Sequence, residues 1–528
     1  MYKSTPHAGA AVSPSRPPIA LDAGLTLREL VRVSKGAKLE LSRAAWQRVR
    51  DARGVIERVL ESRVPTYGLN TGLGSLKKYV ISEELIAQFN ADVVMAHAVS
   101  VSERRLEQPE VRSVMAARVS GLAQGGSGVR TEMVELLVAM LNAGVHPVVH
   151  SENASMGESD LAQMAQIGLV LIGKGRAVVW GDELSGAEAL ERVGLEPLTL
   201  KAKEGLGLIS SNACTVGVGA LAMRDATQLL DAFDIAAAMS FEGFAANLST
   251  LDPAVLAARP FAGQHQRGAH LRELLIGSSL WTAPRSLQDP LSFRCVPQVH
   301  GACCDALAYA AGQIEMMLNA RTDSPLVVAQ DDSVVVNGNF ESTPLALAFD
   351  TIRLALHRVM VMSSQRSNKL LWSDFSGLPT ALADQGNARR GMTFNTISRA
   401  LATIVAKAYS YCLPSSLSYT PQVTEGSDDY ASMAPLSLEH LRKLMRLMRS
   451  ALAIELLYAC HAIELRGAVG TLSPALERVR AWVMERAVTL EDNAALSEFM
   501  AGIDLEELLE LSRPPISADQ LLEAGVVK

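Results

Sequence analysis

Helical periodicity dominates the pattern of apolar and polar positions along the 528-residue chain. In five long segments apolar residues recur at helical spacing around most of the circumference, and such helices are covered by other helices or by another subunit. Alternation typical of strands is confined to short pieces such as 333–340. The pattern predicts an all-α fold with a long central helical bundle. The predicted helices are residues 227–240, 299–321, 344–366, 396–409 and 437–465.

The chain is expected to have four parts. Residues 1–20 are rich in Pro, Ser and Ala and predict a flexible tail. We expect an N-terminal domain over 21–210, the central bundle over 211–480, and a C-terminal helical segment over 481–528.

Composition narrows the possible partners. The net charge is −7 and no long basic run occurs, which argues against a nucleic-acid partner. The most apolar short run, IGLVLIG at 167–173, is too short to cross a bilayer. Six cysteines in so long a chain indicate reduced thiols, and the adjacent Cys303 and Cys304 lack a metal-ligand spacing. We therefore expect a cytoplasmic protein without a membrane contact or a metal.

Several short motifs follow one another in a fixed order. Together they resemble the histidine and phenylalanine ammonia-lyase superfamily, from about Leu21 to the helix that ends near Arg466. The motifs are TYGLNTGLGSL (66–76), His97 in VMAHAVS, KEGLGLISSNA (203–213), LQDPLSFRCVPQVHGA (287–302), NARTDSPLVV (319–328), NGNFEST (337–343) and SGLP (376–379).

The resemblance implies a histidine ammonia-lyase-like all-α fold and a homotetramer whose active sites are each shared by three subunits. It implies α,β-elimination of an amine from an amino acid. In most members an Ala-Ser-Gly tripeptide cyclises into a methylidene-imidazolone (MIO), which attacks the substrate. By motif, Tyr67 corresponds to the base that removes the β-proton, and His97 to a position beside the substrate ring. Arg294 corresponds to the arginine that binds the carboxylate, and Phe340 to an aromatic wall.

The tripeptide itself is different in this chain. Gly157-Glu158-Ser159 precedes the Asp-Leu-Ala that follows the electrophile in the family, so a glutamate stands where a serine must dehydrate. Glutamate has no β-hydroxyl to lose. The upstream Ala154-Ser155-Met156 has a serine, but methionine replaces the glycine whose amide closes the ring. We therefore predict no MIO and no other cofactor.

Two further departures concern the same chemistry. Ser210 replaces an asparagine that supports the electrophile and substrate, and Leu291 replaces a tyrosine that assists amine departure. Glu158 also has a purely structural interpretation, because Ser155-Met156-Gly157-Glu158 fits the S-x-x-E capping box of the helix that follows. This capping role is compatible with a position facing the active site.

The remaining residues suit a substrate that needs no electrophile. A quaternary ammonium has no lone pair to attack the methylidene, and its amine leaves as a neutral molecule. The resemblance therefore points to the branch that eliminates trimethylamine from ergothioneine, ergothionase, with a histidine-like betaine as substrate. A tyrosinate base needs a pKa below about 10. Glu425, Asp428 and Asp429 compete for the acid at the ring, and Asp428 fits best by spacing.

Other assignments stay open. Phe340, Tyr430 and Glu158 are candidates to surround a trimethylammonium group. Lys407 corresponds to a lysine of histidine-type members but also fits a surface helix; Arg389, Arg390 and Lys407 are all candidates for a cation near the sulfur. Two alternative functions are an MIO-dependent ammonia-lyase acting on histidine or another aromatic amino acid, and an inactive homologue kept as a binding protein.

Overall fold

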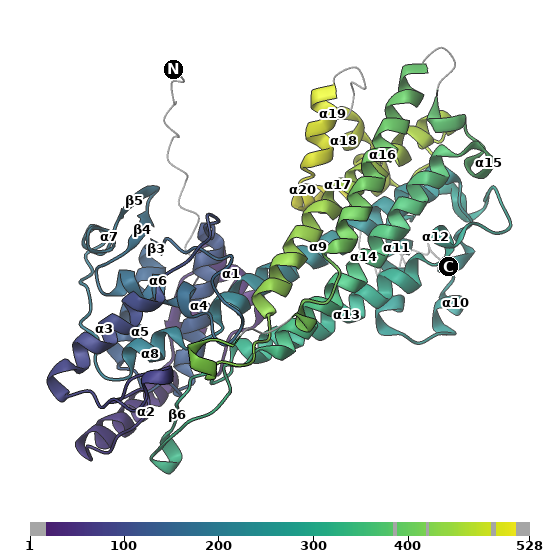
Figure 1. Ribbon diagram of the computed structural model, residues 1–528. Coiled ribbons are helices and arrows are strands. Elements are labelled where there is room, and N and C mark those ends of the chain that lie inside the picture. The colour runs from purple at the N-terminus through teal and green to yellow at the C-terminus, as the bar shows by residue number, and fades with distance from the viewer. Residues whose placement is uncertain (1–16, 384–387, 419–421, 487–492, 514–528) are drawn as a thin grey trace, which may run out of the picture. The chain divides into compact units, whose positions relative to one another are not determined.

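The computed structural model describes residues 17–383, 388–418, 422–486 and 493–513. It divides into two compact units made of non-contiguous segments. The first unit contains the chain as far as Val218, with Glu315–Glu341 and Gln422–Asp429. The second contains Gly219–Ile314, Ser342–Pro421 and the chain from Tyr430 onward. Both units are mainly helical (Figure 1), so the all-α prediction is confirmed.

The first unit consists of short and medium helices with a few short strands. Three of its described helices, α1 (Leu27–Ser34), α2 (Arg43–Glu61) and α7 (Gly186–Arg192), begin with a hydroxyl cap: Ser42, for example, accepts a hydrogen bond from the backbone N–H of Ala45 at the start of α2. The helices are α1 (Leu27–Ser34), α2 (Arg43–Glu61), α3 (Ile86–His97), α4 (Gln108–Ala123), α5 (Thr131–Ala143), α6 (Leu161–Leu171), α7 (Gly186–Arg192) and α8 (Glu204–Ile209).

The prediction of a flexible tail over residues 1–20 is wrong for its last two residues, which belong to a strand. Strand β1 (Ile19–Leu21) pairs in parallel with β2 (Leu39–Leu41). Ile19 and Leu21 are buried on the same face, and two apolar side chains packed into the core outweigh the weak local preference of a Pro-rich stretch. Residues 1–16 lie outside the described residues.

The strand predicted over 333–340 is shorter than expected. It forms β7 (Ser333–Val335), which pairs antiparallel with β6 (Leu326–Val328). The Asn337 side chain donates to the carbonyl of Val335 and accepts from the amide of Asn339, and this local turn ends the strand. The other sheet joins β3 (His146–Pro147), β4 (Arg176–Val179) and β5 (Asp182–Ser185) in antiparallel order.

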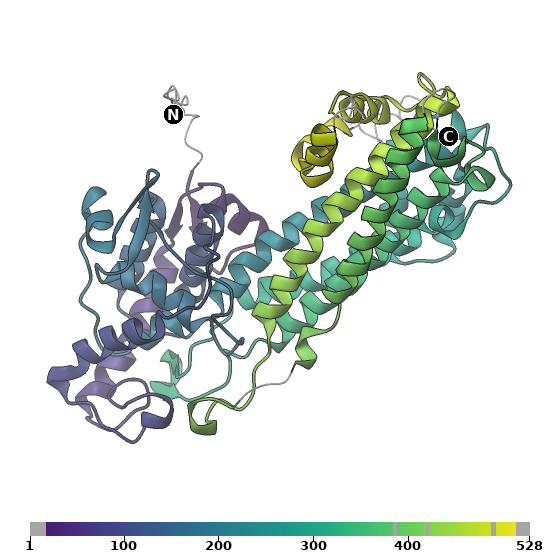
Figure 2. The ribbon, with the colours of Figure 1, turned by 45° about the horizontal axis from the view of Figure 1, so that its top comes forward.

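The second unit is built on long helices, of which α14, α16 and α17 lie side by side (Figures 1 and 2). All five predicted long helices are present, and most extend beyond the predicted bounds. They are α9 (Ala213–Phe244), α13 (Val296–Leu318), α14 (Thr343–Leu371), α16 (Ala388–Ser410) and α17 (Ala434–Arg466). The shorter helices are α10 (Pro253–Ala257), α11 (Ala262–Leu274), α12 (Leu291–Arg294), α15 (Ser373–Ser376), α18 (Pro474–Arg486), α19 (Asn493–Ala501) and α20 (Leu505–Leu511).

Buried ion pairs connect these helices. Arg366 of α14 and Glu455 of α17 are fully buried and form two N–H···O contacts of 2.5 and 3.1 Å. Ser240 of α9 donates to the same carboxylate at 2.8 Å. Charged groups are tolerated in the core only when paired in this way, so the three helices are fixed in register.

One segment, Glu204–Phe244, is long and apolar enough to cross a membrane by length and composition. Its most apolar window is completely buried in the protein, as in the core helix of a soluble fold.

Candidate active site

Tyr67 lies in a loop of the first unit that depends on glycine. The Tyr67 side chain is half-buried, and the backbone N–H of Gly74 donates to its phenol oxygen at 3.2 Å. Gly68 has φ +74°, and a Cβ atom there would lie 2.7 Å from Leu206 Cδ2. The loop therefore needs glycine beside the tyrosine. A donor at the phenol oxygen stabilises negative charge on it, as a base requires.

The turn that precedes α6 holds Glu158. Ser155 Oγ accepts from the amide of Gly157 at 3.1 Å and donates to the carbonyl of Ser159 at 3.0 Å. Helix α6 begins only at Leu161, after Asp160. The predicted capping box is therefore wrong: Ser155 closes a separate turn, and Glu158 stands outside the helix.

Asp160 connects this turn to the segment before α9. Its carboxylate is fully buried and accepts from the amide and the hydroxyl of Thr215 at 2.7 and 2.8 Å. Its own amide donates to the carbonyl of Ser211 at 2.7 Å. Burial raises the pKa of Asp160 to about 6. Ser210, predicted to contact substrate, lies next to this junction and is itself buried.

The Glu158 carboxyl lies among other acids. Among the described residues its Oε1 atom is buried and has no hydrogen-bond partner. Burial, followed by the charges of Asp428 and Glu341, raises the pKa of Glu158 to about 7. The backbones of Glu158 and Glu341 form an antiparallel bridge. This carboxyl therefore changes charge near neutral pH.

Of the three acids left open by the sequence, Asp428 lies near enough to Glu158 to influence it. Asp428 is exposed and accepts a hydrogen bond of 2.5 Å from Thr424 Oγ1. A Cβ atom on Gly74 would lie 2.7 Å from Thr424 Cγ2, so this loop contacts the Tyr67 loop. Glu425 is exposed and has a left-handed backbone, φ +55°.

Phe340 is half-buried and is held by a residue that the sequence patterns did not reveal. Asn212, only 2% exposed, donates from Nδ2 to the backbone carbonyl of Phe340 at 2.6 Å. Asn212 lies in the quoted motif KEGLGLISSNA, two positions after Ser210. The motif points to position 210 through its missing asparagine, whereas the signal for Asn212 is a polar residue directly before a long apolar helix.

His97 is the last residue of α3 and is half-buried. Its Nδ1 lies 2.7 Å from the carbonyl oxygen of Val93. A carbonyl can only accept, so Nδ1 is the donor in this contact, and in the neutral form of the ring Nε2 is an acceptor. The ring can therefore take a hydrogen bond from an imidazole-type N–H.

The other predicted residues belong to the second unit. Arg294 ends α12, is half-buried, and donates from Nε to the carbonyl of Asp289 at 2.9 Å. Lys407 is exposed on α16, which also carries Arg389 and Arg390. Their place relative to the Tyr67 loop stays a prediction.

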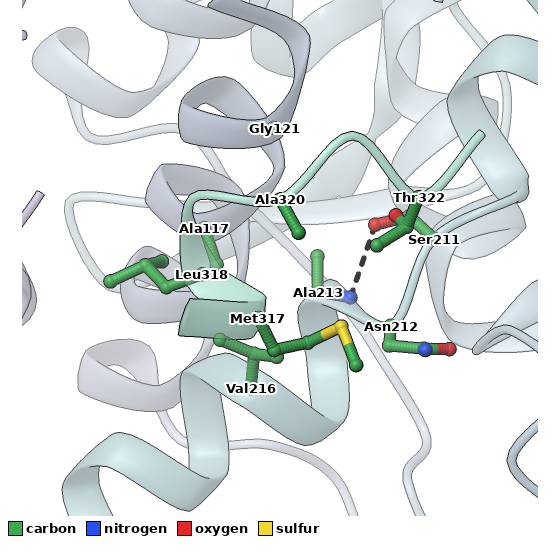
Figure 3. Close-up of a pocket in the computed structure, with 10 residues that line it drawn as sticks. All are labelled: Ala117, Gly121, Ser211, Asn212, Ala213, Val216, Met317, Leu318, Ala320 and Thr322. Atoms are coloured by element: carbon green, nitrogen blue, oxygen red, sulfur yellow. Dashed lines mark hydrogen bonds between the residues drawn. The ribbon is translucent and has the colours of Figure 1, made fainter. Parts of the chain in front are cut away.

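A small pocket of the first unit lies beside the start of α9, lined by the residues in Figure 3. The backbone N–H of Ala213 donates to Ser211 Oγ at 3.1 Å in its wall. Asn212 also lines it, whereas Tyr67, Glu158 and Phe340 do not. The pocket is therefore distinct from the surfaces of those three residues.

Comparisons with known proteins agree with this fold and these motifs. The family model described as aromatic amino acid lyase matches residues 25–485. Histidine ammonia-lyase from Symbiobacterium thermophilum is 38% identical over 496 residues, 93% of this chain and 96% of the relative.

Solved structures with the same fold include an ergothionase and a histidine ammonia-lyase. Ergothionase from Treponema denticola, in complex with desmethyl-ergothioneine sulfonic acid, has a TM-score of 0.87 and 27% identity, and the match covers 94% of this chain and 98% of that one. Histidine ammonia-lyase from Trypanosoma cruzi has a TM-score of 0.84 and 28% identity, with 96% and 98% covered.

Proposed function

The chain belongs to the aromatic amino acid lyase family and is a carbon–nitrogen lyase, and we propose that it eliminates trimethylamine from a histidine-like betaine without an MIO group. Ergothioneine, giving thiolurocanate, is the proposed substrate. The observation that carries this proposal is Glu158, a half-buried carboxyl of raised pKa at the place of the electrophile's serine.

The residues of this turn do not fit an MIO ring. Glu158 has no hydroxyl to eliminate, and the Ser155 hydroxyl is already bonded to the backbone of its own turn. Ring closure at Ser155 would also use the amide of Met156, whose Cβ hinders the tight approach that a glycine allows. A carboxyl group suits a different purpose, attraction of a cationic nitrogen.

The proposed step needs a base and a good leaving group. Tyr67, as phenolate, takes the β-proton; the C–H electron pair forms the Cα–Cβ double bond, and the Cα–N pair departs with neutral trimethylamine. The phenol then returns its proton to solvent. The Gly74 amide donor supports the phenolate before the reaction.

The other residues have binding roles in this proposal. Arg294 binds the substrate carboxylate, His97 accepts from the ring, and Phe340 with Glu158 contacts the trimethylammonium group. Asp428 takes the acid role at the ring in preference to Glu425, because its charge acts on Glu158.

Three further proposals concern surroundings. Ser210 borders the substrate, and Lys407 supplies a cation near the ring. We also propose a cytoplasmic homotetramer whose subunits share each active site; sedimentation of the purified protein at several concentrations tests the tetramer.

A second candidate is an MIO-dependent histidine ammonia-lyase. The names of the curated relatives favour it. It requires cyclisation at Ala154-Ser155-Met156, which removes two waters, so the intact mass of the purified protein decides. An unmodified mass rejects it, and a mass lower by two waters rejects the first proposal.

The direct test is trimethylamine release from ergothioneine and from trimethylated histidine. We expect release by the wild type and none by Tyr67→Phe. The matched control is Tyr79→Phe, in a residue of the same region that is 66% exposed, which should keep full activity. No release by the wild type would refute the proposal, and absence of any eliminated product from histidine as well would favour an inactive homologue.

A further inference from the structure

Contacts around Glu158 form a closed ring within the first unit. From Glu158 the chain runs to Asp160, whose amide bonds to the carbonyl of Ser211. The next residue, Asn212, bonds to the carbonyl of Phe340. The residue after Phe340 is Glu341, whose backbone bridges back to Glu158. The aromatic wall and the carboxyl are therefore linked through the segment that precedes α9.

Asn212 is the one link in this ring made by a side-chain donor. The residue is 2% exposed, and its own carbonyl accepts from the amide of Val216, which fixes it at the first turn of α9. Within the described part of the chain its Oδ1 atom is buried and has no hydrogen-bond partner. The side-chain nitrogen of Asn212 therefore donates to Phe340, while its side-chain oxygen is buried without a hydrogen-bond partner among the described residues.

On the N-terminal side of Phe340 the nearest anchors are Asn337, whose side chain donates to the carbonyl of Asp323 at 3.1 Å, and a longer contact of 3.5 Å from Asn339 to the carbonyl of Arg321. Val336, Gly338 and Asn339 are exposed, and the strand before them ends at Val335. A wall at the end of an exposed segment samples several positions unless a buried contact holds it. The Asn212 contact is such a contact: it is 2.6 Å long and partly buried, and its donor residue is only 2% exposed.

We infer that Asn212 is a positioning residue that holds the Phe340 ring against Glu158, and so sets the binding of the substrate's cationic nitrogen. The inference rests on the proposed function for the kind of nitrogen bound. It acts through Phe340, since its side-chain amide donates to the Phe340 carbonyl. Figure 3 shows Asn212 directly before the start of α9, in the wall of the small pocket.

Loss of the contact should lower the fraction of molecules with a competent wall, and apparent affinity falls by that fraction. We expect Asn212→Ala to raise KM about fivefold while kcat changes little. Asn142→Ala is the matched control, since Asn142 also bonds to backbone groups, the amide and carbonyl of Leu39, in the same unit. This control should lower the melting temperature and leave KM unchanged.

A double-mutant cycle separates positioning from general destabilisation. In a Phe340→Leu background, Asn212→Ala should change KM by less than twofold, because its effect passes through the ring that is already removed. A full fivefold effect in that background overturns the inference, as does an equal KM effect of Asn142→Ala.

The cycle is measured with whichever substrate the enzyme converts, so it stays readable if histidine replaces the betaine and the proposed function fails. Should none be converted, the dissociation constant of ergothioneine measured by calorimetry takes the place of KM. A wild-type protein that binds no ergothioneine and converts no substrate overturns the inference.

Discussion

Protonation of Glu158 should control binding of a permanently cationic substrate. Its pKa of about 7 means that the side chain is largely neutral at pH 6 and largely charged at pH 8. A quaternary ammonium keeps its charge over the whole range. KM for the betaine should therefore fall as the pH rises through 7, and Glu158→Gln should lose this dependence.

The size of the effect follows from burial. A pKa of about 7 instead of 4.5 means that the protein disfavours the charged form of Glu158 by about 3 kcal/mol, if solvent screening is neglected. Because Glu158 is only half-buried, screening by solvent leaves about 1–2 kcal/mol for a cationic ligand to recover. The charged form should therefore bind the cation about 5- to 30-fold more tightly than the neutral form. Because about a tenth of the side chains are already charged at pH 6 and about nine tenths at pH 8, KM should decrease about 3- to 8-fold between these values.

The assay is the initial rate of trimethylamine release between pH 5.5 and 8.5, with kcat and KM separated. Titration of the base affects wild type and Glu158→Gln alike, so the difference between the two KM profiles isolates Glu158. Asp428→Asn and Glu341→Gln remove charges that raise the pKa of Glu158, and should move the midpoint to lower pH, Asp428→Asn further.

Stability provides an independent control. An acid whose folded pKa lies above its unfolded value favours the folded state most at low pH, and that contribution disappears as the pH rises from 4.5 through about 7. Glu158→Gln should therefore melt at the same or a higher temperature at pH 8. Coinciding KM profiles for the wild type and Glu158→Gln would refute the cation-binding role.

Two other substitutions probe the loop and the core. Gly68→Ala should lower kcat at least about tenfold and lower the free energy of unfolding by about 1–2 kcal/mol, because φ +74° and the Leu206 side chain leave no room for a Cβ. A lowered kcat together with an undisturbed Tyr67 loop in the crystal structure of the variant would contradict this reason. Asp234→Asn should cost about 3–5 kcal/mol in urea unfolding, since Asp234 accepts from His270, His300 and Arg267. The folded state lowers the pKa of Asp234, so the stability that its carboxylate contributes is present above pH 3.8 and is lost as the pH falls through the lowered pKa. It raises the pKa of His270, so the stability from this partner is present below pH 6.5 and is lost as the pH rises through the raised pKa. The loss of stability in Asp234→Asn should therefore be largest between pH 3.8 and 6.5.

Much of the fold follows from apolar periodicity, because long helices buried on most sides need apolar residues on most sides. The same criterion missed the part of α9 before residue 227, whose first residues, such as Ala213 and Thr215, give no periodic signal. The segment is helical because Asp160 bonds Thr215 from another part of the chain. Such a tertiary contact has no local pattern.

Some residues of the candidate site can be predicted from the sequence, and others depend on contacts between distant segments. Tyr67 and its glycines could be found from the motif, since a left-handed backbone at Gly68 requires that residue type. The capping box at Ser155 failed because S-x-x-E is satisfied by spacing alone, whereas the hydroxyl instead bonds Gly157 and Ser159. The role of Asn212 depends on Phe340, far away in sequence, and could not be derived from either motif.

The turn before α6 is held by several hydrogen bonds, although in our proposal it does not form the MIO ring. Asp160 is fully buried with a raised pKa, so its charged form opposes folding at neutral pH, and a neutral residue there would avoid that penalty. Its hydrogen bonds to Thr215 and Ser211 keep Glu158 at one place beside Asp428. A buried acid that lowers stability while it fixes the position of Glu158 is expected if the Glu158 carboxyl binds the substrate, as we propose. A turn with no remaining role would need neither the buried acid nor the carboxyl it holds.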